Sequence, residues 1–282
     1  MKYILLSLIT CSSLLFAQEG LKTTQQQIAD TKAEIEALQA NLKKLEESLP
    51  KKIKDEKAAL AKQKELEALK VHAALGFVNT AGNTDTTTYS LDTKIQKRFG
   101  KHEYTFLGDV EYGSDNNVVT KNKYFVELDY GYGLNEKLYL EYITAYQFDE
   151  FSGFDYRAYT GPGLKYKVLN SEVQKLDLSS ALLFSSDKKE SEESSYNYGS
   201  FRAKVDYSWQ MFKNLKFEET FTYRTDVTRA EDFFIYSKTG LVSKITDIFS
   251  FGINYKIDYV NVPDTGKAKS DRTLSANLIA DF

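Results

Sequence analysis

A period of two in the hydrophobic pattern governs this chain from Val71 to its last residue. In the clearest run, residues 138–148, Leu, Tyr, Thr and Phe side chains at even positions alternate with Tyr, Glu, Ile, Ala and Gln. Successive side chains of a β-strand point to opposite faces, so one face of such a strand suits lipid and the other suits water. The alternation recurs in residues 89–96, 249–259 and 274–282. The pattern predicts an all-β region that begins at Val71.

Counting such runs predicts twelve strands. Most of them reach the roughly 9 to 11 residues that a tilted strand needs to cross a bilayer. The predicted strands are residues 71–79, 88–99, 102–113, 121–133, 137–148, 155–168, 174–184, 196–210, 214–225, 232–244, 248–259 and 270–282.

The connections between these strands differ in length on the two sides. Every second connection is short, as at 100–101 and 134–136, whereas the others are generally longer and polar, as at 79–87, 185–195 and 260–269. Short turns on one side and long loops on the other are typical of outer-membrane barrels. Because the strand count is even, both ends of the barrel are expected on the short-turn side, which is the periplasm.

Aromatic residues support the same interpretation. Of 20 Tyr, 18 Phe and 1 Trp, only Tyr3 and Phe16 precede residue 71, and many of the others lie near strand ends, where interfacial girdles are found. The last residue, Phe282, ends an alternating strand and resembles the signal that the outer-membrane assembly machinery recognises. We predict an antiparallel up-and-down transmembrane β-barrel of about 12 strands at 71–282; a soluble β-sandwich is the alternative.

Residues 1–17 have the features of a signal peptide, which implies export. A positive start is followed by an apolar stretch and by Ala17, after which we expect cleavage. The alternative, lipidation at Cys11, is disfavoured because Thr10 precedes that cysteine and the apolar run continues past it. The mature chain therefore has no cysteine for a disulfide, a thiolate zinc site or a nucleophile.

Residues 18–70 are predicted to form a periplasmic helical arm, because they contain no aromatic residue and are rich in Ala, Glu, Lys, Leu and Gln. A coiled-coil-like heptad seam runs through 21–49, and Pro50 is expected to break the helix. The arm could be a solvated spacer, a coiled coil that self-associates or contacts the cell wall, or a hairpin or plug. The seam residues are Leu21, Thr24, Ile28, Thr31, Ile35, Leu38, Leu42, Leu45 and Leu49.

Two segments carry a resemblance to a known family. The stretch LGFVNTAGNTDTTTYSLDTKIQKRFGKHEYTFLGDVEYG (75–113), with GNTD at 82–85, and DEFSGFDYRAYTGPGLKYKV (149–168) resemble the YdiY-like family of salt-induced outer-membrane proteins. The resemblance covers about residues 71–282 and omits the arm. It implies an outer-membrane barrel of unknown cargo with no catalytic motif, and its salt-stress label suggests a role in osmotic adaptation.

Little in the chain points to enzymatic chemistry. The only histidines, His72 and His102, stand at strand starts outside any nucleophile motif, so we predict no enzyme and no catalytic residues. The acidic group Asp149, Glu150 and Asp155 matches no EF-hand spacing, so we predict no metal site and no cofactor. The net charge of −3, with both signs interspersed, argues against nucleic acid as a partner.

Two loop segments and one arginine have patterns that predict their local structure. The charged run 187–193 is expected to be a solvated outer loop, and GNTD (82–85) to be an outer turn with a glycine at positive φ. Arg157 is expected to point into the lumen and to form a structural ion pair with lumen acids.

The inward face supplies the functional hypothesis. Charges there would be very costly in a dry core, so the lumen must be hydrated or densely paired. We predict a narrow channel for small hydrophilic solutes or ions, narrowed by Phe125, Tyr139 and Tyr159; the alternative is a non-conducting barrel that anchors the arm. The predicted lumen charges are Asp92, Lys94, Arg98, Glu103, Asp109, Glu111, Lys123, Glu127, Asp129, Glu141, Arg157, Lys165, Lys256 and Asp258.

Overall fold

The computed structural model divides the chain into two units, Met1–Glu65 and Leu66–Phe282. It describes residues 26, 29–45, 47–49, 51–57, 60, 64, 67–80 and 86–282. The predicted signal peptide, the predicted break at Pro50 and the GNTD turn lie outside the described residues.

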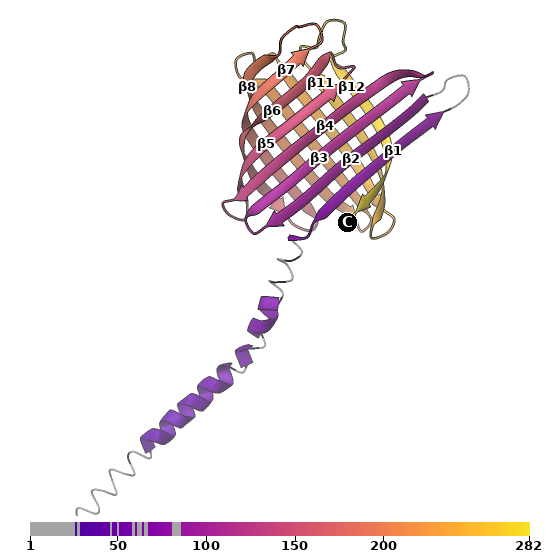
Figure 1. Ribbon diagram of the computed structural model, residues 1–282. Coiled ribbons are helices and arrows are strands. Elements are labelled where there is room, and N and C mark those ends of the chain that lie inside the picture. Colours follow the sequence, from indigo (N-terminus) through magenta and orange to yellow (C-terminus); the bar gives the residue numbers. More distant parts are fainter. Residues whose placement is uncertain are drawn as a thin grey trace, which may run out of the picture. The chain divides into compact units, whose positions relative to one another are not determined.

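The second unit is a closed antiparallel β-barrel (Figure 1). Each strand pairs with its neighbours in sequence and β1 pairs with β12, so the predicted twelve-stranded up-and-down topology is confirmed. The strands are β1 (Lys70–Thr80), β2 (Thr86–Phe99), β3 (His102–Asp115), β4 (Val118–Gly133), β5 (Leu138–Asp149), β6 (Phe154–Asn170), β7 (Gln174–Lys189), β8 (Tyr196–Phe212), β9 (Leu215–Asp226), β10 (Phe233–Lys244), β11 (Phe249–Val260) and β12 (Ser270–Asp281).

The last residue closes the barrel. The N–H of Phe282 donates a hydrogen bond to the carbonyl oxygen of Val71 at 2.9 Å, and the N–H of Val71 donates to the carbonyl oxygen of Phe282 at 2.9 Å. The remaining pairs of this seam run from His72 opposite Asp281 to Gly76 opposite Asn277. Closure removes the unpaired strand edges that an open sheet would present to lipid.

Two connections differ from the sequence-based prediction. The expected loop between β3 and β4 is a tight turn of Asn116 and Asn117, whose φ angles of 47° and 62° asparagine tolerates better than most residues. Strand β7 continues to Lys189, five residues beyond its predicted end, because Asp187 pairs in register with Tyr196 of β8. The prediction that Asp187 belongs to a solvated loop is therefore wrong.

The outward face of the barrel is apolar, as the alternation predicts. On β5, Leu140, Tyr142 and Tyr146 are between 45% and 50% exposed, while Glu141 and Ile143 between them are buried. Aromatic rings pack together on this surface near both ends of the strands. The pairs include Tyr104–Tyr130 and Phe99–Tyr104 near the turns, and Tyr124–Phe148, Tyr146–Tyr156, Tyr223–Phe233 and Phe233–Tyr259 near the loops. An apolar band between two aromatic girdles is the arrangement of a transmembrane barrel.

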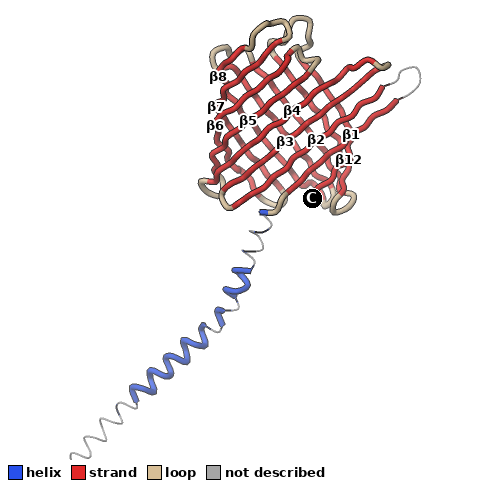
Figure 2. Tube along the Cα trace, viewed as in Figure 1, coloured by secondary structure: helices blue, strands red, loops and turns tan. Residues whose placement is uncertain are grey.

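The first unit contains helix over residues 29–45, 47–49 and 51–57, which Figure 2 draws in blue. The seam residues Ile35, Leu38, Leu42, Leu45 and Leu49 are each between 48% and 63% exposed. The helical prediction for this part of the arm is confirmed; its coiled-coil character stays a prediction. No helix within the described residues combines the length and apolarity needed to cross a membrane.

Candidate functional site: the barrel lumen

A cavity of about 840 Å³ occupies the lumen, and all twelve strands contribute to its lining. It extends from residues near the turns, such as His72 and Lys175, to residues near the loops, such as Arg157 and Asp258. Its walls carry Lys and Arg in nearly the same number as Asp and Glu. The lumen is therefore a polar space inside an apolar shell, the reverse of a soluble barrel core.

At the inner end, lysines and glutamates pair at short range. Lys165 Nζ lies 2.8 Å from Glu103 Oε1 and 2.9 Å from Glu141 Oε1, and Lys167 Nζ lies 3.0 Å from Glu103 Oε2. Tyr139 is fully buried beside them, with Lys167 Nζ 4.2 Å from its ring centroid. The charges of this region are neutralised locally.

Further along the lumen, a buried ion pair connects β4 to β8. Arg202 donates from Nη2 to Glu127 Oε1 at 2.9 Å, and the Tyr159 hydroxyl donates to Glu127 Oε2 at 2.9 Å. Both charged side chains are at most 5% exposed. Such a pair resists separation, because removing one partner leaves an uncompensated buried charge.

A second network crosses from β11 to β2 and β3. Lys256 donates to Asp92 at 3.2 Å and to Glu111 at 2.9 Å, and it also contacts Asp109. This lysine is 3% exposed, so its three carboxylate partners supply the compensation that burial requires.

Near the loops, aromatic and arginine side chains converge on Phe234 of β10. The ring of Phe154 lies 6.0 Å from the ring of Phe234 in an edge-to-face arrangement. The guanidinium carbons of Arg157 and Arg224 lie 4.9 and 4.5 Å from the centroid of Phe234. An irregularity in the pairing of β6 between Phe154 and Tyr156 directs Phe154 inward. We call Phe154, Arg157, Arg224 and Phe234, with the neighbouring Asp187, the constriction.

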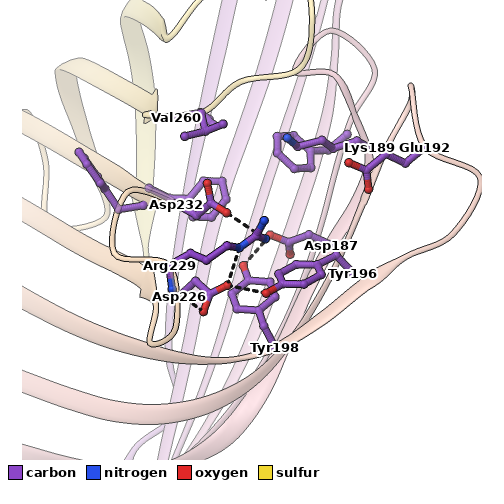
Figure 3. Close-up of a pocket in the computed structure, with 13 residues that line it drawn as sticks. Asp187, Lys189, Glu192, Tyr196, Tyr198, Asp226, Arg229, Asp232 and Val260 are labelled. Carbon is purple, nitrogen blue, oxygen red and sulfur yellow. Dashed lines mark hydrogen bonds and ion pairs between the residues drawn. The ribbon is translucent and has the colours of Figure 1, made fainter.

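Beyond the constriction lies a smaller pocket of about 110 Å³ (Figure 3). It shares Phe234 and Val260 with the main cavity, so these two residues lie between the two spaces. Arg229 projects into this pocket and binds Asp232 at 2.9 Å and Asp226 at 3.4 Å. We call this space the outer pocket.

The loop between β11 and β12 reaches the opposite rim of the barrel mouth. Ser191, in the β7–β8 loop, donates hydrogen bonds to both carboxylate oxygens of Asp264 from its N–H and its hydroxyl. A Cβ on Gly153 in the β5–β6 turn would approach Asp264 Cβ to 2.6 Å, and Gly153 has a φ of 81°. This close approach explains why glycine occupies that turn. We call the Asp264–Ser191 contact the latch.

Hydrogen bonding lowers the pKa of Asp264 in the latch. The bonds from Ser191 hold the pKa of Asp264 below its ordinary value, because they favour the charged carboxylate. The latch is therefore formed with Asp264 ionised.

The structure bears out most of the predicted lumen face. Phe125 and Tyr159 line the cavity, and so do all the predicted charges except Arg98 and Glu111; Arg98 lies over the inward ring of Tyr139 and Glu111 binds Lys256. The prediction for Arg157 is only half right. It points inward, but it stacks on aromatic rings and forms no ion pair within the described part of the chain.

The lumen residues of β7 to β10 were not predicted from the sequence. The alternation of Phe201, Ala203 and Val205 could have found the inward residues of β8, since it leaves three charged residues between and beside them. The missed inward residues include Asp187, Arg202, Lys204, Asp206, Arg224 and Lys238.

The two histidines occupy different faces. His72 lines the lumen, with Nδ1 2.7 Å from Asp281 Oδ1, whereas His102 lies in the inner aromatic girdle, with Nδ1 2.8 Å from the Tyr130 hydroxyl oxygen. Among the described residues, no group of three or more His, Cys, Asp or Glu side chains is arranged to hold a metal ion.

A family model described as "Protein of unknown function, DUF481" matches residues 73–282. The chain belongs to this family. The resemblance to the YdiY-like family is thereby confirmed, because that family is the DUF481 family. A search of curated proteins found no match for this DUF481 chain.

Several solved structures are similar to the DUF481 barrel at low sequence identity. The COG4313 outer membrane channel from Pseudomonas putida F1 is 12% identical with a TM-score of 0.46; the match covers 76% of this chain and 94% of that one. The NanC porin is 12% identical with a TM-score of 0.42, covering 76% and 98% of the two chains. The KdgM porin is 13% identical with a TM-score of 0.40, covering 76% and 99%.

Proposed function

We propose that this DUF481 protein is an outer-membrane β-barrel that acts as a narrow channel for small hydrophilic solutes or ions. The observation that carries the proposal is the polar cavity of about 840 Å³, lined by charged side chains from every strand. Charged side chains in such number require water or paired charges, and a hydrated lumen conducts. No enzymatic activity is part of the proposal.

The proposed location follows from the surface of the barrel. Its apolar band and aromatic girdles suit a bilayer, and the short turns, both barrel ends and the arm are assigned to the periplasm. Insertion is assigned to the outer-membrane assembly machinery through β12 and the Phe282 that follows it.

Planar-bilayer recording of the refolded mature protein tests the channel. We expect discrete, reproducible current steps that scale with salt concentration. A protein that migrates as a folded, heat-modifiable barrel but gives no steps would sink the channel proposal.

A second function rests on the arm. Its exposed stripe of Ile35, Leu38, Leu42, Leu45 and Leu49 is unusual for a single helix in water, since narrow apolar stripes of this kind normally pack against a partner helix. On this alternative, the barrel anchors a periplasmic helix that associates with itself or with the cell wall.

Sedimentation of the full mature chain in detergent tests the arm. The variant Leu38→Lys/Leu42→Lys is expected to shift an oligomer to a monomer, while Gln39→Lys, at an exposed polar position beside the seam, should leave it unchanged. A monomeric wild type would argue against self-association, and binding to isolated cell wall would then be measured with the same variants.

The salt-stress role is proposed from the family label alone. Growth of a deletion strain at high salt, complemented by wild type and by a non-conducting variant, would test whether the barrel serves osmotic adaptation through conduction.

A further inference from the structure

We propose that Arg157 and Arg224 at the constriction bind a small anion and make the channel selective for anions, either small inorganic anions or carboxylate solutes. This inference rests on the proposed channel function and adds to it the charge class of what passes.

Arg157 carries the proposal. The residue is only 7% exposed, and its guanidinium lies 5.0 Å from the Phe154 centroid and 4.9 Å from the Phe234 centroid. Within the described part of the chain the guanidinium makes these ring contacts but no ion pair and no hydrogen bond. It also lines the lumen cavity, so a solute in that cavity can reach it. A buried guanidinium without a carboxylate is costly unless a mobile anion or water compensates it.

The acids around Arg157 already have partners. Asp258 binds Lys123 at 2.6 Å, and Asp149 accepts a hydrogen bond from the N–H of Phe151 at 3.2 Å. Asp187 accepts a hydrogen bond from the Tyr198 hydroxyl at 2.7 Å through Oδ2. Of the carboxylate oxygens of these three acids, only Asp187 Oδ1 is buried without a hydrogen-bond partner. The alternative to a bound anion is therefore an ion pair that forms when Arg157 shifts onto Asp187.

Arg224 is the arginine that binds Asp187. Its Nη2 lies 3.4 Å from Asp187 Oδ2, while its Nη1 donates to two neutral hydroxyls, those of Ser185 and Tyr198, each at 2.9 Å. Two guanidinium groups thus lie against the ring of Phe234 with one acid between them. The constriction carries an excess of positive charge, whereas the cavity as a whole is close to balanced.

The location of this excess positive charge lets it act on permeating ions. The constriction lies where the main cavity and the outer pocket share Phe234 and Val260, so an ion that moves between these two spaces passes its arginines. Low-dielectric walls focus the field of fixed charges, and rings of arginine favour anions in pores. Guanidinium also binds carboxylate with matching geometry, which makes a carboxylate solute as suitable as chloride.

The test is the reversal potential of the full mature protein in a KCl gradient. We expect the wild type to prefer anions, Arg157→Gln to lose most of that preference, and Arg157→Gln/Arg224→Gln to lose it entirely. Asp187→Asn should raise the preference, since it removes the acid that Arg224 binds at the constriction. The matched control is Lys167→Gln, which removes a positive charge that Glu103 neutralises at the inner end and should leave the reversal potential unchanged.

A binding measurement separates this inference from the channel proposal. The line width of ³⁵Cl NMR in uncharged detergent micelles reports chloride at arginine sites without any conduction. We expect broadening by the wild type that falls in Arg157→Gln and persists in Lys167→Gln, with heat-modifiable migration as the check of folding.

The outcomes are distinct. Current steps without anion preference, or a preference that Arg157→Gln leaves intact, overturn the site and spare the channel. Absence of steps sinks the channel, and the chloride line width then decides the site: broadening that depends on Arg157 supports it, and equal broadening by both proteins overturns it. Replacing chloride by acetate distinguishes the ligands, because a retained preference shows that the site also accepts carboxylates and a lost one restricts it to small inorganic anions.

Discussion

The inner end of the lumen and the constriction handle buried positive charge in different ways. At the inner end, Lys165 and Lys167 lie 2.8 to 3.0 Å from glutamate oxygens. At the constriction, Arg157 and Arg224 stack on aromatic rings, and only Arg224 binds Asp187.

The residue types suit these two solutions. A lysine ammonium is a compact point charge that needs a carboxylate or water close by, whereas the planar guanidinium of arginine is more weakly hydrated and stacks on rings. A guanidinium that stacks on a phenylalanine ring can therefore stay buried without a carboxylate partner, whereas a lysine ammonium could not. The comparison predicts that the constriction sets the ion selectivity of the channel and that the charges of the inner end mainly stabilise the barrel.

The largest effect is expected when Arg202, in the middle of the lumen, loses its acidic partner and is left without an ion pair, as Arg157 is. Glu127→Gln removes the carboxylate of Arg202, and the unfolding free energy in lipid vesicles should fall by about 3–5 kcal/mol, because the guanidinium stays buried. The double variant Glu127→Gln/Arg202→Met should recover most of this loss. A loss below about 1 kcal/mol would mean that arginine needs no acid anywhere in this lumen, and the contrast would disappear.

The next effect concerns the ring that the two arginines share. Phe234→Ala should raise single-channel conductance severalfold and lower stability by about 1–3 kcal/mol through lost cation–π contacts. Phe221 of β9 is exposed and lines neither the main cavity nor the outer pocket, so Phe221→Ala should leave conductance unchanged. Equal conductance of Phe234→Ala and wild type would place the narrowest point elsewhere.

A smaller effect is expected at the latch above the constriction. Because the pKa of Asp264 is lowered in the folded protein, its contribution is complete above the ordinary value of 3.8 and is lost as the pH falls through the lowered value. Acidification should therefore free loop 261–269, measured as increased current noise and faster cleavage by an acid-active protease. Asp264→Asn should show the acid behaviour already at pH 7, while Asp247→Asn on the turn side should not. A pH-independent loop would contradict the latch.

The smallest effect is expected at the inner end. Lys167→Gln leaves Glu103 bound to Lys165, so stability should change by at most about 1 kcal/mol, as for other partly hydrated ion pairs, and conductance should not change. The check is the unfolding free energy of Lys167→Gln and of Glu127→Gln, measured by chemical unfolding under the same conditions. A loss as large as that of Glu127→Gln would make the inner end as critical as the middle.

Much of the barrel was predictable because its constraints are local. The alternation in residues 138–148 determines which side chains meet lipid, and short turns such as 100–101 determine which strands are neighbours. The inward direction of Arg157 followed from the same period. The inward direction of Phe154 did not, because the pairing irregularity in β6 reverses the alternation there.

The sequence by itself determined a twelve-stranded barrel with a charged interior and a preceding helix, since period, turn length and composition act between near neighbours in the chain. Only the tertiary structure decided which lumen side chains meet. Arg157 and Phe234, for example, lie on strands that are brought together by closure and shear of the barrel. The same holds for Asp264 and Ser191, whose contact depends on a loop reaching across the mouth. Contacts of this kind depend on distances across the lumen, which no periodicity along a strand encodes.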